Sequence, residues 1–214
     1  MPLSILDDKL WFPSPTNATE DGLLAMGGDL STERLLLAYR KGIFPWFEDK
    51  LPLWWSPDPR FVLFPDELKI SKSMQQVLRS NQFQFKTNTA FKNVIHNCKT
   101  AKRNQQGTWI TDEVEEAYIN LYKKGYAHSA EAWQGNTLIG GLYGIRLGKV
   151  FFGESMFSQV SNASKFAFIS YVRQLIKEGV ELIDCQLYTS HLESLGARMT
   201  DRRHFLDLLK MYIP

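Results

Sequence analysis

Hydrophobic residues recur at helical spacing in six stretches of the chain. The best specified stretch follows Thr111, which can cap a helix over 112–124 that has acidic residues in its first turn, lysines in its last turn and Gly125 at its end. The other stretches cover 32–41, 71–79, 91–98, 162–178 and the residues after Asp201. We predict a helix in each of them.

Strand-like patterns fill the gaps between these helices after residue 60. They cover 61–64, 83–85, 128–133, 138–146, 150–157 and 180–187. Short connections that contain glycine join the three strands between 128 and 157, which predicts an antiparallel meander. Because the last strand follows the long helix at 162–178, we expect a mixed sheet with flanking helices.

The first 60 residues have a different pattern, which is rich in turns. Prolines and tryptophans crowd the stretches 42–47 and 54–60, a composition that suits neither a helix nor a central strand. We therefore expect an ordered loop there. The predicted fold class is α+β, with a small N-terminal domain over 1–60 and a larger domain with the mixed sheet over 61–214.

The composition is that of a folded chain without a membrane segment. Of its 214 residues 44% are hydrophobic and 22% are charged, which excludes disorder and coiled coil. No apolar run approaches the roughly 18 residues that span a bilayer, and the charged residues at 7–9 do not fit a secretory signal. We expect a cytoplasmic protein. Two cysteines and four histidines lie scattered, so no metal site is predicted.

Positive charge is concentrated in the segment 65–106. It holds eight Lys or Arg residues and two acidic residues, although the formal net charge of the chain is only +2. A solvated surface is the usual meaning of such a run, and attraction to a nucleic-acid backbone is the functional alternative, for which Lys72, Arg79 and Lys86 are the candidates. Composition alone favours the solvated surface.

An acid and an amide lie close together in the apolar strand at 180–187. Strand alternation puts Asp184 and Gln186 on one face, about 7 Å apart, and turns Cys185 to the other face. The acid and the amide would then both point outward from the same face of the sheet. The alternative is that Asp184 is a hydrogen-bonded acid with a purely structural role, which is the commoner fate of an isolated aspartate.

A second carboxylate interrupts the strand at 150–157. The same alternation puts Glu154 on one face with Phe152 and Met156. A carboxylate among apolar groups needs a cation inside the protein or a cationic ligand. Glu154 is therefore either a structural ion-pair partner or part of a binding site.

Ten blocks of sequence occur in order along nearly the whole chain. They are GLLAMGGDL (22–30), GIFPWF (42–47), WWSPDPR (54–60), TWIT (108–111), AHS (127–129), GGLYG (140–144), FGESMFS (152–158), NASK (162–165), LIDCQ (182–186) and SLGA (194–197). In this combination the chain resembles the leucyl/phenylalanyl-tRNA–protein transferases, bacterial enzymes of the N-degron pathway. The resemblance implies a small N-terminal domain and an acetyltransferase-like second domain.

The resemblance also implies an activity. It is the transfer of Leu or Phe, and also Met, from tRNA to proteins that begin with Arg or Lys. In this reading Gln186, held by Asp184, contacts the attacking amine, and Glu154 recognises the substrates. No cofactor is expected, because the aminoacyl ester on tRNA is already activated and the reaction chiefly needs positioning.

Six further residues are assigned by the resemblance to the donor substrate. They line the places of the terminal adenosine and of the amino-acid side chain, and they are Trp46, Trp109, Tyr118, Phe151, Met156 and Tyr171. Strand alternation places Phe151 opposite Glu154 unless Gly153 bends the strand. Each of these side chains, taken alone, would more often be plain core.

Two other functions compete with aminoacyl transfer. One is an acetyl-CoA-dependent N-acyltransferase, but no pyrophosphate loop of the pattern Gln/Arg-x-x-Gly-x-Gly/Ala occurs in the sequence. The other is an RNA-binding module without catalysis, which would explain the basic segment but not the acids and the amide in apolar strands. Aminoacyl transfer accounts for both features.

Overall fold

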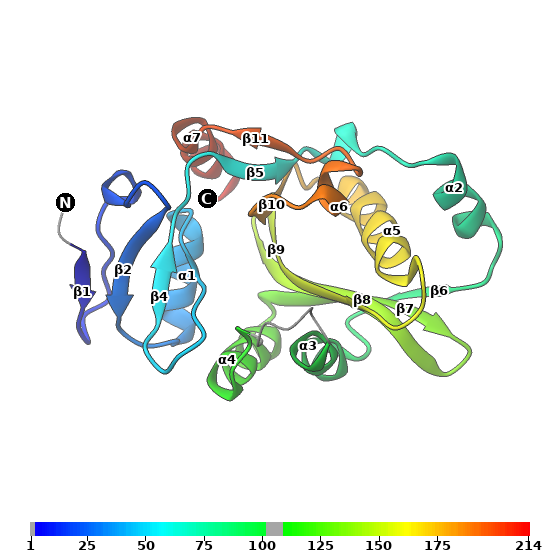
Figure 1. Ribbon diagram of the computed structural model, residues 1–214, viewed down its shortest axis with the longest axis horizontal. Coiled ribbons are helices and arrows are strands. Elements are labelled where there is room, and N and C mark those ends of the chain that lie inside the picture. The colour runs from blue at the N-terminus through cyan, green and yellow to red at the C-terminus, as the bar shows by residue number, and fades with distance from the viewer. Residues whose placement is uncertain (1–2, 102–108) are drawn as a thin grey trace.

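The computed structural model describes residues 3–101 and 109–214. It contains a four-stranded sheet, at the left in Figure 1, followed by a seven-stranded sheet with helices on both faces. The chain passes from the first sheet to the second near residue 60. The predicted α+β class, with a small N-terminal part before a mixed sheet, is confirmed.

The first sheet holds the N-terminal strands. In order across the sheet these are β1 (Ser4–Leu6), β2 (Leu23–Gly27), β4 (Leu53–Trp55) and β3 (Phe44–Pro45). Helix α1 (Thr32–Arg40) connects β2 to β3, and its cap is the hydroxyl of Ser31, which accepts a hydrogen bond from the backbone N–H of Arg34. Leu35 and Tyr39 on α1 are fully buried. A single 3₁₀ turn lies at Pro15–Asn17.

The loop expected over 42–47 and 54–60 is wrong in part, because both stretches contribute strand residues, whereas the rest of each stretch is irregular. Pro45 lies on the edge strand β3, where a missing N–H removes no bond from the interior of the sheet. Trp54 lies on β4 inside the sheet and is fully buried, and its indole N–H donates to the carbonyl oxygen of Gly27 at 2.9 Å. Aromatic packing and one side-chain hydrogen bond therefore hold a proline-rich segment in a sheet.

The second sheet contains the predicted meander. In order across the sheet its strands are β11 (Arg198–Thr200), β5 (Arg60–Leu63), β10 (Leu182–Gln186), β9 (Val150–Ser158), β8 (Thr137–Leu147), β7 (Ala127–Gln134) and β6 (Gln84–Thr87). β9 and β10 are parallel, and all the other neighbours are antiparallel. The mixed sheet is therefore confirmed, and β11 is the strand that the sequence pattern missed.

Helices cover both faces of the second sheet (Figure 1). Helix α5 (Ala163–Lys177) lies on one face, and α3 (Phe91–Thr100) and α4 (Asp112–Lys123) lie on the other. The remaining helices are α2 (Lys72–Arg79), α6 (Ser190–Glu193), α7 (Arg202–Tyr212) and a 3₁₀ turn at Pro65–Glu67. Among the described residues, none of the helices combines the length and the apolar character that crossing a bilayer requires.

One hydrophobic cluster joins the two sheets. Its members include Leu35, Tyr39, Trp54, Tyr118, Phe152 and Phe205, which come from both parts of the chain. Helix α7 also returns to the first part, where the guanidinium of Arg40 donates to the carbonyl oxygen of Pro214 at 2.6 Å. The division into domains at residue 60 stays a prediction, since the two parts share this core.

A bulge in β9 changes which side chains share a face. Gly144 pairs with Gly153 and Tyr143 pairs with Ser155, which leaves Glu154 as the extra residue. Beyond the bulge the alternation is inverted, so Met156 packs in the same cluster as Phe151 and not with Phe152. The expectation that Phe152, Glu154 and Met156 share one face is therefore wrong for Met156.

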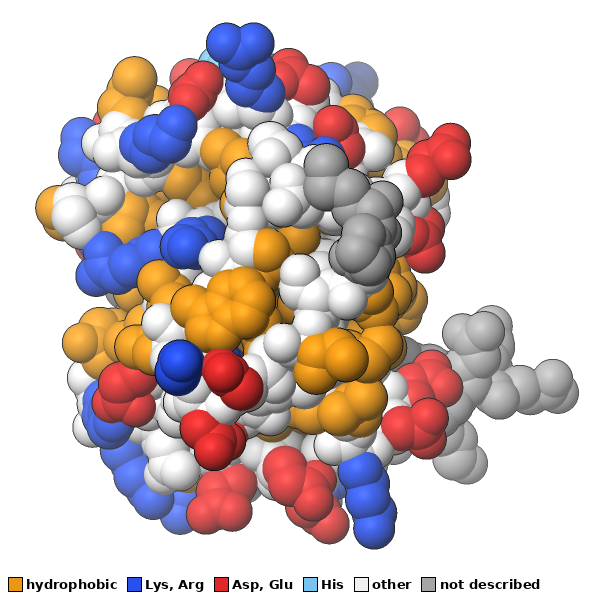
Figure 2. Space-filling model, turned by 90° about the vertical axis from the view of Figure 1, so that its left-hand side faces the viewer, with side chains coloured by type: hydrophobic (Ala, Val, Ile, Leu, Met, Phe, Trp, Pro, Cys, Tyr) orange, Lys and Arg blue, Asp and Glu red, His pale blue; other side chains and the backbone are white. Residues whose placement is uncertain are grey.

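Both signs of charge are present at the end of the molecule that the first sheet forms. Figure 2 views the end formed by the first sheet, where Lys and Arg side chains lie mainly at the left and top and acidic side chains gather below and to the right. The basic helix α2 lies at the opposite end (Figure 1). The end formed by the first sheet is therefore not uniformly positive.

Candidate active site

A cavity of about 490 Å³ opens beside the end of β10. Both sheets contribute to its wall, since Phe44 and Pro45 come from the first sheet and Glu154 and Gln186 from the second. Most of the other lining side chains are hydrophobic, with contributions from α5, α6 and the segment before α4. A few polar groups inside an apolar cavity are typical of a small-molecule or substrate site.

Asp184 lies behind the cavity wall in a buried ion pair. Its two carboxylate oxygens accept hydrogen bonds from Nε and Nη2 of Arg60 at 2.8 and 2.7 Å. Both side chains are at most 1% exposed. The guanidinium lies between the rings of Phe44 and Phe205, at 4.6 and 4.8 Å from their centroids. The expectation that Asp184 looks out together with Gln186 is wrong, because a second bulge separates them in β10.

Gln186 has an uncommon backbone conformation that Asp184 supports. Its φ angle is 63°, in the left-handed region that non-glycine residues rarely adopt. The backbone N–H of Gln186 donates to Oδ1 of Asp184 at 2.9 Å, so the carboxylate that binds Arg60 also holds this turn. Cys185, the bulged residue, lines the cavity too, but burial raises the pKa of its thiol and disfavours a thiolate nucleophile.

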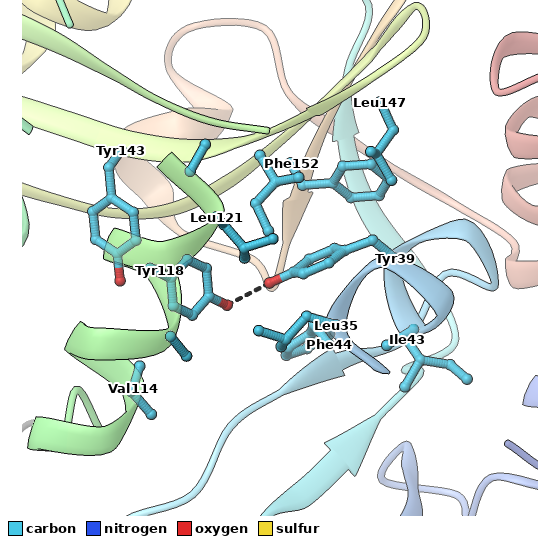
Figure 3. Close-up of a cluster of buried hydrophobic side chains, with 14 of the residues drawn as sticks. Leu35, Tyr39, Ile43, Phe44, Val114, Tyr118, Leu121, Tyr143, Leu147 and Phe152 are labelled. Atoms are coloured by element: carbon cyan, nitrogen blue, oxygen red, sulfur yellow. Dashed lines mark hydrogen bonds between the residues drawn. The ribbon is translucent and has the colours of Figure 1, made fainter. Parts of the chain in front are cut away.

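Glu154 and Gln186 meet at the cavity wall. The side-chain Nε2 of Gln186 donates to Oε1 of Glu154 at 3.0 Å, and the hydroxyl of Tyr118 donates to Oε2 at 2.8 Å. Figure 3 shows that the hydroxyl of Tyr39, from α1, points at the hydroxyl of Tyr118, from α4, and the two are hydrogen-bonded. An amide and a chain of two phenols therefore fix the carboxylate.

The pKa of Glu154 is raised by its surroundings. Burial raises this pKa from the ordinary value of 4.5 to about 7, although the hydroxyls of Tyr39 and Tyr118 and the amide of Gln186 oppose the rise. The negative charge of Asp184 raises it further. Near neutral pH this group can therefore both accept and release a proton.

Three of the six aromatic and apolar candidates line the cavity, namely Trp46, Trp109 and Met156. Trp46 is 39% exposed and packs against Trp55 with 5.6 Å between ring centroids. Tyr118 is buried behind the cavity wall, where it contacts the lining residues Glu154 and Tyr143.

The other two candidates, Phe151 and Tyr171, do not line the cavity. They are buried and pack edge to face, with 5.1 Å between ring centroids and 81° between planes. Gly153 does belong to the bulge, but the distortion brings Glu154, and not Phe151, to the cavity wall.

The basic candidates lie on two separate elements. Lys72 and Arg79 are exposed at the two ends of α2, whereas Lys86 is on β6 with its ammonium 4.7 Å from the centroid of the Trp133 ring. None of the three lines the cavity. Lys102 and Arg103 of the basic segment, and Thr108 of the TWIT block, lie outside the described residues.

Sequence reasoning missed two residues that support the site. Arg60 ends the WWSPDPR block. The one signal for it was Asp184, since an acid in an apolar strand needs a cationic partner. Tyr39 carried no signal beyond its place on the inner face of α1. Within the described ranges, no group of three or more His, Cys, Asp or Glu side chains could hold a metal ion.

Comparison with known proteins gives the family. The family model described as leucyl/phenylalanyl-tRNA protein transferase matches residues 62–210, and a model of its N-terminal domain matches 28–58. A leucyl/phenylalanyl-tRNA–protein transferase of Flavobacterium johnsoniae is 58% identical over 203 residues, which cover 94% of this chain and 96% of that one. Another, of Syntrophobacter fumaroxidans, is 54% identical and covers 100% of this chain and 92% of that one.

These matches define an aminoacyltransferase. The chain belongs to the leucyl/phenylalanyl-tRNA–protein transferase family. Among solved structures, a GCN5-related N-acetyltransferase from Kribbella flavida has a TM-score of 0.40 and 8% sequence identity, covering 78% of this chain and 60% of that one. A likeness of that size says nothing about activity.

Because of the buried ion pair, we expect substitutions of Asp184 and Gln186 to differ in their effect on stability. Asp184→Ala leaves the guanidinium of Arg60 buried without its carboxylate, and we expect the free energy of unfolding to fall by about 3–5 kcal/mol. Gln186→Ala removes one hydrogen bond at the cavity wall, and we expect a loss of about 1 kcal/mol or less. Urea unfolding of both variants measures the difference. Equal stability of the two would contradict a supporting role for Asp184.

Proposed function

We propose that the protein transfers Leu or Phe, and also Met, from aminoacyl-tRNA to the N-terminal Arg or Lys of acceptor proteins in the cytoplasm, marking them for degradation in the N-degron pathway. The observation that carries the proposal is the contact between Gln186 and Glu154 at the wall of an apolar cavity. Membership of the family supplies the reaction class. The acceptor type and the pathway are inferred from the resemblance.

The reaction needs an oriented amine and a route for its proton. The α-amine of the acceptor attacks the ester carbonyl carbon of the aminoacyl-tRNA, and a C–N bond forms. The ester C–O bond then breaks, and the 3′ oxygen of the tRNA leaves with a proton. Because Nε2 of Gln186 donates to Glu154, its amide oxygen is left to accept a hydrogen bond from the attacking amine. Glu154, with a pKa of about 7, is matched to taking up a proton from an amine whose pKa is about 7.7–8.

Asp184 has a positioning role in this proposal. Both of its oxygens are engaged by Arg60, and it is fully buried, so it does not reach the amine. It acts by holding the backbone of Gln186. The aminoacyl ester is already activated, so neither Asp184 nor Gln186 needs to form a covalent intermediate, and no cofactor is required.

The donor substrate divides between two walls of the cavity. Trp46 and Trp109 offer aromatic faces on which the terminal adenosine can stack, which is worth about 1–3 kcal/mol per base. Met156 and Phe168 lie at an apolar wall suited to a Leu or Phe side chain. Phe151 and Tyr171 then support this wall from behind, and Tyr118 acts through Glu154.

The backbone of the tRNA is assigned to the basic set on α2 and β6. Lys72, Arg79 and Lys86 are exposed, and no carboxylate partner within the described part of the chain forms an ion pair with them. Exposed cations of this kind attract phosphates in a salt-dependent way. The end formed by the first sheet carries side chains of both charges (Figure 2).

The activity itself is tested by mixing the protein with charged Leu-tRNA and a peptide that begins with Arg. We expect a Leu-Arg peptide by mass spectrometry, and a rate about 10-fold to 1,000-fold lower for Gln186→Ala, because the attacking amine loses an orienting contact. Acetyl-CoA in place of Leu-tRNA is the control for an ordinary N-acyltransferase. Transfer from acetyl-CoA alone, or tRNA binding without any product, would favour the competing functions.

Two substitutions distinguish the walls of the donor site. Trp109→Ala should weaken the use of every aminoacyl-tRNA, because stacking on adenosine does not depend on the amino acid. Met156→Ala should change the ranking of Leu, Phe and Met, because it alters the apolar wall. The values of kcat/KM for the three charged tRNAs give the comparison. A change of amino-acid preference in Trp109→Ala alone would mean that the two assignments are reversed.

The basic set is tested with two donors of different size. Replacing Lys72, Arg79 and Lys86 with Ala should weaken the use of whole tRNA and lower the slope of its salt dependence by close to one unit for each lost phosphate contact. An aminoacyl-adenosine fragment lacks the acceptor stem, so the triple variant should use it almost as well as the wild type. The exposed Lys92→Ala on α3 is the control. Equal losses with both donors would indicate a damaged active site instead.

A further inference from the structure

A lysine ties the end of α3 to the beginning of α4. Lys99 lies in the last turn of α3, and its ammonium donates hydrogen bonds to the carboxylates of Asp112 and Glu115 in the first turn of α4. The distance from Nζ to Oε2 of Glu115 is 2.8 Å. The two helices lie side by side on one face of the second sheet (Figure 1). We call Lys99, Asp112 and Glu115 together the helix clip.

Water reaches the two carboxylates of the helix clip unequally. The side chains of Lys99 and Glu115 are 19% and 18% exposed, whereas that of Asp112 is 94% exposed. Water and salt screen a partly buried ion pair less than an exposed one. His96, one turn earlier on α3, lies with its Nδ1 3.6 Å from Oε1 of Glu115. The contact between Lys99 and Glu115 is therefore the stronger half of the helix clip.

The helix clip holds a helix that supports two parts of the site. Trp109, which lines the cavity, comes just before the first turn of α4. The backbone N–H of Thr111, the residue that caps α4, donates to the carbonyl oxygen of Trp109 at 3.1 Å. Tyr118, which donates to Glu154, lies further along the same helix. The orientation of α4 therefore affects both the cavity wall and the carboxylate.

Trp109 and Tyr118 are anchored to different degrees. Tyr118 is fully buried, its hydroxyl is hydrogen-bonded to that of Tyr39, and its ring packs edge-on against Tyr143 with 5.4 Å between centroids. Trp109 is only partly buried and lies beyond the capped end of the helix. A tilt of the first turn of α4 moves Trp109 more than Tyr118. The position of the tryptophan is therefore the feature of the site that depends on the helix clip.

We propose that Lys99 is a positioning residue for the donor substrate, because it fixes the first turn of α4 and with it the ring of Trp109. This inference rests on the proposed function, since it takes Trp109 to stack on the terminal adenosine. Lys99 itself lies outside the cavity wall. Orienting the amine and moving its proton stay with Gln186 and Glu154, so Lys99 affects the KM of the donor and not kcat.

The test is the variant Lys99→Met, which keeps the aliphatic length of the side chain and removes its charge. The donors are leucyl-adenosine and whole Leu-tRNA, and the acceptor is a peptide that begins with Arg. We expect the KM of both donors to rise about threefold to tenfold with kcat unchanged, because part of the stacking on Trp109 is lost. Lys99→Arg keeps the charge and should restore the wild-type KM. Lys92→Met, at an exposed position of the same helix, is the matched control and should leave KM unchanged.

A cycle of single and double variants assigns the effect to the helix clip. Glu115→Gln removes the shielded carboxylate and should raise KM as Lys99→Met does, whereas Asp112→Asn should have a smaller effect. The double variant Lys99→Met/Glu115→Gln should be little worse than either single one, because both remove the same contact. Urea unfolding should give midpoints close to that of the wild type, since ion pairs near the surface contribute little to stability. Fully additive effects on KM would contradict the pairing.

The remaining outcomes overturn the inference in distinguishable ways. An unchanged KM in a folded Lys99→Met variant shows that Trp109 does not depend on the helix clip. A rise in KM with whole tRNA alone assigns Lys99 to the tRNA backbone, because leucyl-adenosine lacks the acceptor stem. A fall in kcat at constant KM means that the helix clip acts on Glu154 through Tyr118. A wild type that forms no product with either donor refutes the proposed function itself.

Discussion

The buried ion pair between Arg60 and Asp184 is the interaction on which the geometry of the site depends. Removing two charges from water costs free energy, and only close, bidentate contact with further hydrogen bonds offsets that cost. Here Asp184 binds the guanidinium with both oxygens and the backbone N–H of Gln186 with one of them. A left-handed non-glycine residue costs of order 1–3 kcal/mol, and the carboxylate is the group that stabilises it at Gln186.

Strand register and two bulges together bring the polar groups to one place. β9 and β10 are parallel, with Asp184 paired to Phe152, so Gln186 and Glu154 each lie two residues further along neighbouring strands. A bulge in each strand at this point then turns the two side chains toward each other. Bulges next to active sites commonly re-aim side chains in this way. The contact is therefore a property of the sheet, and the phenols of Tyr39 and Tyr118 add to it from the two helices α1 and α4.

The sequence predicts the elements whose stability is local. Three of the predicted helices begin at a hydroxyl or carboxylate cap, at Ser31, Thr111 and Asp201, and such a cap acts within three residues. The short connections of the meander fix β7 to β9 in the same way. The first sheet escaped prediction because its strands are short and held by distant contacts, such as the bond from Trp54 to Gly27.

The site was predictable in its residue types and less so in its geometry. An acid in an apolar strand pointed to Asp184, with Gln186 beside it, and to Glu154, and the resemblance to a family added the tryptophans. Simple strand alternation then failed at both bulges, so it placed Met156 and Asp184 on the wrong faces. The partner of Asp184 lies 124 residues away, and no local pattern identifies it.

The position of Arg60 between Phe44 and Phe205 has a consequence for the order in which the site is completed during synthesis. Phe44 belongs to β3 near the beginning of the chain, and Phe205 belongs to α7, which follows the last strand. Because α7 follows all of the strands in the chain, Phe205 is synthesised after both sheets, and until then one of the two aromatic contacts of the guanidinium is missing. Packing of this last helix therefore completes the surroundings of the ion pair whose carboxylate holds the backbone of Gln186.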